Sequence, residues 1–412
     1  MRVKTRWSSV TAAAALAVGA LVAVAPGATA VAPRVQGIDG NSIKVGGVIE
    51  AVSFSGIEDG FKARINRANT KKELGKYKID YIGSTDVGQG NVDKALATTQ
   101  SLIERDQVFA LAPVSTVSFQ QSVATYAASK RVPYFGAGFT KAFCKPNTYG
   151  LSFIGCAIGA EYGFTTAAES VSAALGKKPS ELRWAIAALA QPDGQQIVDD
   201  YSTLVEGVGG KVVYAKAVIP PGGGGDLQPF VSAVMDTEPD VVWVLAAAEV
   251  LGFTSAMKAA GYTGQMLNSA FYLPGLISQV KTIADALDGS LVATNTPTIE
   301  ADSPYVQQMI KDYEAIGKSA SDISFGGSFG YQTADLMIAM LKKVSPNFDQ
   351  LVQTISKGYS YQPAKQATPL KWPAAYNQGG SCATTLKIVN AAYEIVHPWN
   401  CDGKRVKFSA SG

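Results

Sequence analysis

The chain has 412 residues, of which 47% are hydrophobic and 17% charged, and 36 basic against 33 acidic residues give a formal net charge of +3. This near balance of charge argues against a nucleic-acid partner. After the first thirty residues no segment is long and apolar enough to span a membrane. The remaining length of about 380 residues suffices for two domains of ordinary size.

The first thirty residues have the pattern of a secretory signal peptide. Arg2, Lys4 and Arg6 precede an apolar run over residues 12–25, and A-T-A at residues 28–30 fits a cleavage site. A transmembrane anchor is the rival interpretation, but the run is short for a bilayer. Cleavage would remove three basic residues and no acidic one, leaving a neutral chain. Because no cysteine lies near the cleavage site, we expect an exported protein without a lipid anchor.

Strand-like and helix-like segments alternate over residues 43–155. Within them, Ile57, Phe61, Ile65 and Ala68 mark one face of a helix. The alternation predicts a parallel sheet with helices on both faces, which is an α/β fold. The expected strands are residues 43–49, 77–82, 108–113, 132–136 and 151–155, and the expected helices begin at residues 57, 91 and 118.

Residues 108–140 form one strand–helix–strand unit with polar loops after both strands. Ser118 and Gln121 fit a capping pattern that would open the helix, and basic residues at 130–131 would close it. Ligands of open α/β sheets bind at the carboxyl ends of the strands, and the N–H groups at a helix start favour an anionic group. We therefore expect these loops to take part in a ligand site.

A second α/β series of similar size follows the first. Its connection at residues 220–225 reads P-P-G-G-G-G, but the Lys-Ser/Thr of a phosphate-binding loop is absent, so we interpret it as a flexible turn. The expected strands are residues 183–189, 211–219, 241–246 and 266–272, and the expected helices are residues 162–175, 194–206, 227–235, 250–260 and 276–287.

The last part of the chain contains helices that have no strands of their own. Such helices must pack on a sheet formed earlier, so we expect the chain to return to the first series. Residues 291–296 lead out of the second series, and the tail at residues 384–396 is expected to form a hairpin. The expected helices are residues 304–316, 328–344 and 348–357.

The four cysteines fall as two sequence-local pairs. Three pairings are possible, and in the oxidising compartment of an exported protein we predict Cys144–Cys156 and Cys382–Cys401 disulfides. A zinc site is the rival, but the spacings do not fit and His397 is the only histidine. We interpret His397 as structural and expect neither a metal nor a cofactor.

Six short segments, in order over nearly all of the mature chain, resemble a known family. They are I-K-V-G at 43–46, V-S-T at 114–116, G-A-G-F-T at 136–140, G-Y at 261–262, F-G-Y at 329–331 and P-L-K-W at 369–372. Together they resemble the type I periplasmic binding proteins, and within that class the branched-chain amino-acid-binding group of ABC transporters. No single segment is specific, but their order is.

The resemblance implies two lobes, each a parallel sheet flanked by helices, joined by three crossovers. A ligand would be trapped between the lobes by hinge closure. The expected lobes are residues 41–155 plus 291–360, and residues 156–290 plus 361–412. The resemblance also implies a monomer that takes a small-molecule ligand and has an ABC permease in the membrane as its partner.

The resemblance also implies where a ligand carboxylate would bind. In the family's amino-acid binders a hydroxyl residue in one loop and backbone groups in the next hold the carboxylate. Ser115 and Thr116 match the first loop, and Ala137 and Gly138 match the second. Uncharged donors at a helix start can hold a carboxylate without an arginine. The alternative is that Ser115 and Thr116 only cap the helix.

The ligand's ammonium group lacks its expected partner in this sequence. The family's acid is missing from residues 268–272, and the usual aromatic residue is missing near residues 191–194. A buried unpaired ammonium would be costly. Asp193 or Glu249 are candidate substitutes, although either fits a solvated loop or a helix cap as well.

Aromatic residues stand at the predicted strand ends. Phe54, Phe139, Phe271 and Tyr272 would suit a flat or apolar ligand body if they face the cleft, although they could instead pack under the loops. We therefore expect an apolar or aromatic carboxylate as the ligand, rather than a free leucine-like amino acid.

An exported solute-binding protein that serves an ABC importer is the leading hypothesis for function. An extracellular enzyme is disfavoured because the only histidine, His397, lies in the tail far from the strand ends, and because the H-E-x-x-H and paired-carboxylate motifs are missing. A soluble ligand-sensing adaptor to a separate receptor stays open, and the neighbouring genes would separate it from a transporter component. The expected location is the periplasm, a periplasm-like envelope space, or the medium.

Overall fold

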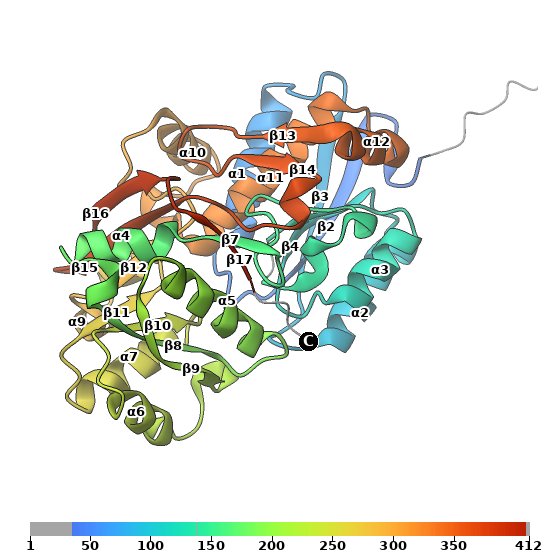
Figure 1. Ribbon diagram of the computed structural model, residues 1–412. Helices are drawn as coiled ribbons and strands as arrows, with labels where there is room; N and C mark the ends of the chain where they lie inside the picture. Colours follow the sequence, from blue (N-terminus) through green and yellow to red (C-terminus); the bar gives the residue numbers. More distant parts are fainter. Residues whose placement is uncertain (1–34, 138, 409–412) are drawn as a thin grey trace, which may run out of the picture. The chain divides into compact units, whose positions relative to one another are not determined.

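The computed structural model describes residues 35–137 and 139–408, so the predicted signal peptide and Gly138 lie outside the described residues. Within these residues the main strands form one six-stranded and one seven-stranded sheet. Helices pack on both sheets, which confirms the expected α/β class (Figure 1). No helix in this part of the chain is long and apolar enough to cross a membrane.

The first sheet is built from the amino-terminal third of the chain. Its strand order is β3-β2-β4-β5-β6, and all of these pairs are parallel. A short strand that the sequence did not predict pairs antiparallel with the start of β2. The strands are β1 (Ile38–Asp39), β2 (Ser42–Ile49), β3 (Lys78–Asp86), β4 (Ala110–Ser115), β5 (Tyr134–Gly136) and β6 (Gly150–Ser152).

The second sheet has the order β16-β15-β12-β11-β10-β8-β9. The strands from β12 to β9 are parallel, whereas in the tail hairpin β15 pairs antiparallel with β12 and β16 pairs antiparallel with β15. The strands are β8 (Arg183–Leu189), β9 (Lys211–Ile219), β10 (Val241–Leu245), β11 (Gln265–Asn268), β12 (Leu291–Thr294), β15 (Ala383–Val389) and β16 (Ala392–Asn400). Smaller ribbons pair β7 (Tyr162–Phe164) with β17 (Arg405–Lys407), and β13 (Tyr359–Tyr361) with β14 (Leu370–Trp372).

Helices cover both faces of each sheet (Figure 1). On the first sheet these are α1 (Ile57–Thr70) and α11 (Phe325–Lys343) on one face, and α2 (Val92–Gln100) and α3 (Gln121–Ser129) on the other. On the second they are α4 (Thr166–Ala174) and α5 (Gly194–Gly207) on one face, and α6 (Gln228–Met235), α7 (Val250–Ala259) and α9 (Lys281–Leu287) on the other. The remaining helices are α8 (Pro274–Gln279), α10 (Pro304–Glu314) and α12 (Phe348–Gly358).

Glycines bring α1 and α11 into direct backbone contact. A Cβ at Gly330 would lie 1.9 Å from the carbonyl oxygen of Ile57, and one at Gly60 would lie 1.9 Å from that of Gly327. Any larger residue would push the two helices apart. This contact holds α11, which comes late in the chain, against the first sheet and places its first residue beside the strand ends.

Both predicted disulfides are confirmed. Cys144 is bonded to Cys156, and Cys382 is bonded to Cys401. The second bond closes the β15–β16 hairpin at its open end.

Several sequence-based boundaries are wrong, each for a local reason. The predicted helix at 162–175 begins only at Thr166, because Tyr162–Phe164 pairs with β17. The predicted strand at 266–272 stops at Asn268, whose side-chain oxygen accepts the Phe271 N–H at 3.1 Å and turns the chain. Helix α3 begins at Gln121 without a Ser118 cap, because the Ser118 hydroxyl donates to Glu50.

Candidate functional site

A cavity of about 80 Å³ lies where strands of both sheets reach their carboxyl ends. This volume is several times the roughly 10–15 Å³ that one water needs. Lining residues that follow strands of the first sheet are Ser53, Phe54, Gln89, Val117 and Phe139. Lining residues that end or follow strands of the second sheet are Leu189, Gln191, Leu245, Ala247, Ser269 and Ala270. We call it the apolar cavity.

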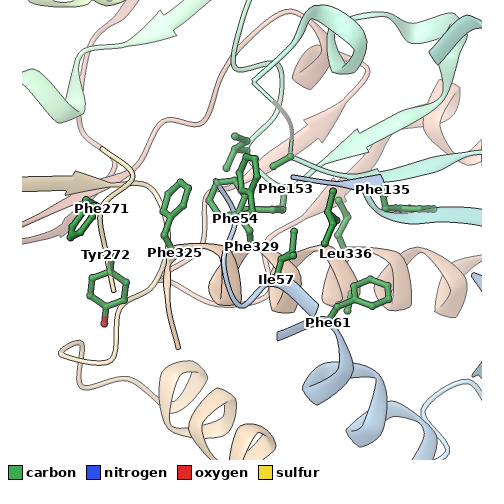
Figure 2. Close-up of a cluster of buried hydrophobic side chains, with 14 of the residues drawn as sticks. Phe54, Ile57, Phe61, Phe135, Phe153, Phe271, Tyr272, Phe325, Phe329 and Leu336 are labelled. Atoms are coloured by element: carbon green, nitrogen blue, oxygen red, sulfur yellow. The ribbon is translucent and has the colours of Figure 1, made fainter. Parts of the chain in front are cut away.

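Aromatic rings dominate one wall of the apolar cavity. Phe54 stacks on Phe139 with ring centroids 6.4 Å apart and on Phe325 with centroids 6.3 Å apart. Phe329 packs against all three rings, and its ring centroid is 4.3 Å from that of Phe325 (Figure 2). Since Phe325 is the first residue of α11, the glycine contact between α1 and α11 also fixes this wall. Stacked rings of this kind favour a flat or apolar ligand body.

The polar groups that line the apolar cavity are uncharged. None of its described lining residues is acidic or basic, and the polar ones are Ser53, Gln89, Gln191 and Ser269 together with the Tyr201 phenol. The Ser269 oxygen accepts the Trp243 indole N–H at 2.8 Å. Because an indole only donates, the Ser269 hydroxyl proton stays available for a ligand oxygen. The Gln191 Oε1 is buried and has no hydrogen-bond partner among the described residues.

A second cavity of about 100 Å³ adjoins the first. The two share Phe139, Tyr201, Ser269 and Phe325 as lining residues. The second cavity is also lined by Thr166, Thr294, Asn295 and the carboxylate residue Asp200. We call it the polar cavity.

Asp200 has an unusual environment for a carboxylate. It lies on α5 with 2% of its surface exposed. Its Oδ1 accepts a hydrogen bond from Gln196 at 2.8 Å, whereas its Oδ2 has no partner within the described chain. Burial raises the pKa of the Asp200 carboxyl to about 6, against the opposing effect of the Gln196 hydrogen bond.

The Thr116 hydroxyl, which was predicted to hold the ligand carboxylate, lies in a buried hydrogen-bond network around Glu50. The Thr116 hydroxyl donates to Glu50 Oε1 at 2.6 Å and accepts the Ser118 N–H at 2.9 Å. Ser118 donates to the same carboxylate oxygen at 2.9 Å. Burial raises the pKa of Glu50, although both hydroxyls oppose this. Thr116 therefore already serves a protein carboxylate.

Two of the other predicted donors, Ser115 and Ala137, are fully buried and line neither cavity. Ser115 is fully buried, and its hydroxyl has no partner in the described part of the chain. The Ala137 N–H donates to the Val114 carbonyl at 3.1 Å. Contacts from Ser115, Thr116, Ala137 and Gly138 to a ligand remain predictions.

The acids considered for an ammonium group lie outside both cavity linings. Asp193 Oδ1 is 3.9 Å from the Lys141 ammonium nitrogen. Glu249 is buried, and its Oε1 accepts the Gly222 N–H at 2.9 Å, which anchors the glycine-rich connection.

His397 lies on β16 with its Nδ1 3.1 Å from the Pro398 carbonyl oxygen. No group of His, Cys, Asp and Glu side chains in residues 35–137 and 139–408 is arranged to hold a metal ion.

Of the four predicted aromatic residues, the structure brings Phe54 and Phe139 together in the apolar cavity. Phe271 and Tyr272 lie on a separate loop (Figure 2) and are buried there. The Tyr272 hydroxyl donates to Glu300 at 2.8 Å, and the Phe271 carbonyl accepts the Tyr393 hydroxyl at 2.9 Å. A role for Phe271 and Tyr272 in binding remains a prediction.

Sequence reasoning missed several lining residues. Phe325 was missed because its helix was expected to begin at 328, although Ser324, whose oxygen accepts the Gly327 N–H at 2.9 Å, gives a cap signal. Ala270 and Ser269 lie one and two residues before the chosen aromatic pair, Phe271 and Tyr272. Asp200 and Tyr201 come from within α5, and no local signal marks them as facing a cavity.

Residues 42–392 match the sequence model of a family described as periplasmic binding protein. No curated protein matches the sequence. The fold is shared with solved structures at low sequence identity. One is an ABC transporter solute-binding protein from R. palustris in complex with 4-hydroxybenzoate, at 18% identity and a TM-score of 0.68, covering 89% of this chain and 96% of that one.

Two other similar structures have different names or ligands. A leucine-binding protein from Thermotoga maritima is 16% identical with a TM-score of 0.66, covering 87% of this chain and 99% of that one. A branched-chain amino-acid ABC transporter protein from Thermus thermophilus with bound valine is 14% identical with a TM-score of 0.67, covering 88% of this chain and 97% of that one. At such identities the likeness concerns the fold.

Proposed function

Because the chain belongs to the periplasmic binding protein family, as the order of its sequence segments had indicated, we propose that it is the solute-binding component of an ABC importer. Its ligand is a small apolar or aromatic carboxylic acid held in the apolar cavity. One observation carries this proposal. The cavity at the strand ends of both sheets is walled by Phe54, Phe139 and Phe325 and contains no charged lining residue among those described.

The ligand's ring or apolar body lies against the three phenylalanines. Its carboxylate points toward the loops of the first sheet, where Ser53, Gln89 and Val117 follow β2, β3 and β4. Hydroxyl, amide and backbone N–H groups can hold a carboxylate without a basic residue when several of them converge on it. The first-sheet side also has the helix start of α3, which favours a negative charge.

A free branched-chain amino acid fits this cavity poorly. Its ammonium group would enter a lining without an acid among the described residues. Asp193 is near Lys141, and Glu249 already accepts the Gly222 N–H. A buried ammonium without a carboxylate or several acceptors costs several kcal/mol, of order 2–7 by the scales for polar groups alone. The neutral lining therefore selects acids without an amine beside the carboxylate.

The transport role places the protein outside the cytoplasm. We propose that residues 1–30 are a cleaved signal peptide, that the mature protein is a monomer without a lipid anchor, and that it delivers its ligand to a membrane permease. The protein binds and releases the ligand without chemical change. Residues 41–155 plus 291–360 and residues 156–290 plus 361–412 act as two lobes that close on the ligand. Small-angle scattering should then give a smaller radius of gyration when ligand is added.

Native mass spectrometry of protein purified from its own host tests the ligand class. Binding proteins of closed form retain their ligand, so we expect one added mass, which denaturation releases as an aromatic or aliphatic acid without an amine beside its carboxylate. Release of leucine, isoleucine or valine would contradict the proposal. If no mass is retained, a thermal-shift screen of acids decides, since a true ligand raises stability by mass action.

A pair of variants tests the position of the cavity. Phe139→Ala removes a ring that lines both cavities, and the loss of its stacking and apolar contact should weaken acid binding by at least about tenfold. The matched control is Val52→Ala, because Val52 is 72% exposed in the loop that leads to Phe54. Equal affinities of the two variants, measured by isothermal titration calorimetry, would place the ligand elsewhere.

A further inference from the structure

We propose that the polar cavity is a second subsite of the same ligand site, in which Asp200 accepts a hydrogen bond from a donor group at the ligand end remote from its carboxylate. The inference rests on the proposed function and narrows the ligand to an acid that carries a hydroxyl or an ammonium group at its far end.

The two cavities are continuous through shared residues. Phe139, Tyr201, Ser269 and Phe325 line both, so a ligand lying on Phe139 and Phe325 has its far end at the entrance of the polar cavity. There Asp200 is the only charged residue among the described lining residues. A ligand that ended in the apolar cavity would leave this carboxylate without a role in binding.

Asp200 has an unused acceptor. Its Oδ1 is occupied by the Gln196 amide, and its Oδ2 has no partner among residues 35–137 and 139–408. Only 2% of the Asp200 surface is exposed. A buried carboxylate oxygen without a donor is costly, so a donor that arrives with the ligand gains more here than at an exposed acid.

Neighbouring charges leave Asp200 able to accept. Lys141 is the cation that acts on it, but its ammonium is 3.9 Å from Asp193. Asp199, the preceding residue on α5, opposes ionisation of Asp200, and the nearby Gly159 N–H favours it without forming a hydrogen bond to Oδ2. Tyr201, which lines both cavities, is itself kept protonated because burial and the Asp200 charge raise the pKa of its phenol to about 12. The Asp200 carboxylate can therefore accept a hydrogen bond from a ligand donor, but it cannot serve a ligand acceptor.

Isothermal titration calorimetry at pH 7.5 tests the subsite with benzoate, 4-methoxybenzoate, 4-hydroxybenzoate and 4-(aminomethyl)benzoate. The hydroxyl and ammonium acids carry a far donor, whereas the other two do not. We expect at least one donor acid to bind the wild type about tenfold or more tightly than 4-methoxybenzoate, as a hydrogen bond to a charged group allows. The tighter of the two donor acids shows whether the donor is neutral or cationic.

Two variants of α5 separate the subsite from a general effect on the helix. Asp200→Asn should abolish the preference for donor acids while leaving benzoate affinity within about threefold. Asp199→Asn is a matched control, because Gln195 donates to Asp199 at 2.8 Å just as Gln196 donates to Asp200. It should keep the preference. A preference that survives Asp200→Asn would overturn the inference.

Failure of the subsite can be distinguished from failure of the proposed function. If none of the four acids binds the wild type, the benzoate-type ligand class is wrong, and the melting temperature of the ligand-free variants decides about Asp200. An unpartnered carboxylate kept for a ligand destabilises the empty protein, so Asp200→Asn should then melt higher than the wild type at pH 7.5. A lower melting temperature would show that Asp200 has a structural role and would overturn the inference.

Discussion

Two buried acids, Asp335 and Asp200, show how differently this protein treats charge in its interior. Asp335 lies beside the α1–α11 contact, where Arg64 donates to its Oδ1 and the Tyr361 hydroxyl donates to its Oδ2 at 3.0 Å. Asp200 lies beside the cavities, where only one of its oxygens has a partner among the described residues. Both are almost inaccessible to water, at 7% and 2% exposure.

The difference separates structural charge from charge kept for a ligand. Around Asp335 the network is saturated, because Arg64 also binds Glu73 through two hydrogen bonds of 2.9 and 3.1 Å. Complete pairing of this kind fixes the position of α1 against α11. Around Asp200 the pairing is incomplete, because Oδ2 has no hydrogen-bond donor among the described residues and an added donor would supply one. Mutations should therefore have opposite effects in the two regions.

The largest effect is expected from Arg64→Met. This change takes the closest cation away from the buried Asp335 carboxylate and leaves Arg67 only at 3.8 Å, which should cost about 3–5 kcal/mol of unfolding free energy. Urea denaturation measures the loss. Lys62→Met, on the exposed side of the same helix, is the control and should cost less than about 1 kcal/mol. Equal losses would mean that the network is not structural.

A smaller loss is expected from Glu73→Gln, about 1.5–3 kcal/mol at pH 7. Burial raises the pKa of Glu73, but hydrogen bonds from Arg64 and Lys342 lower it to about 2, against an ordinary value of 4.5. The stabilisation is therefore complete above pH 4.5 and is lost as the pH falls toward 2. The difference between wild type and variant should shrink between pH 5 and pH 3, and a constant difference would contradict the ion-pair origin.

Asp200→Asn should act in the opposite direction. The pKa of Asp200 is raised to about 6 from an ordinary 3.8, mainly by burial, so the folded protein takes up a proton between these values. The ionised form opposes folding above pH 6 and the effect vanishes below about pH 4. The variant should gain on the order of 1 kcal/mol at pH 7, seen as a higher melting temperature that converges with the wild type near pH 4.

The smallest effect is expected from Thr116→Val, which removes one donor from the buried Glu50. We expect a loss of about 1 kcal/mol in stability. Affinity for the acid should change less than threefold, because the hydroxyl serves Glu50. A tenfold loss of affinity with unchanged stability would instead favour the role that the family resemblance assigned to Thr116.

Much of the fold follows from local patterns in the sequence. Strands β8 and β9 were predicted with the bounds that the structure has, because Arg183–Leu189 and Lys211–Ile219 are mainly apolar and turn residues follow them. Helix α1 followed from its apolar spacing, and the disulfides followed from sequence-local pairs. Strand β7 did not, because its partner β17 lies more than two hundred residues away and local propensity does not reveal it.

The site was predictable only where it depends on strand ends. Phe54 and Phe139 were found because they lie in the loops that follow β2 and β5. Asp200 and Phe325 were not, because each lies on a helix and faces the cavities only through tertiary packing. For Phe325 that packing depends on Gly60 and Gly330, whose importance appears only when α1 and α11 are seen together.

A crystal structure of the protein with 4-hydroxybenzoate would test the central claim most directly. We expect the ring between Phe139 and Phe325, the carboxylate at the loops after β2, β3 and β4, and the hydroxyl within hydrogen-bond distance of Asp200 Oδ2. A ligand bound outside the two cavities, or with its carboxylate at Asp200, would contradict the account.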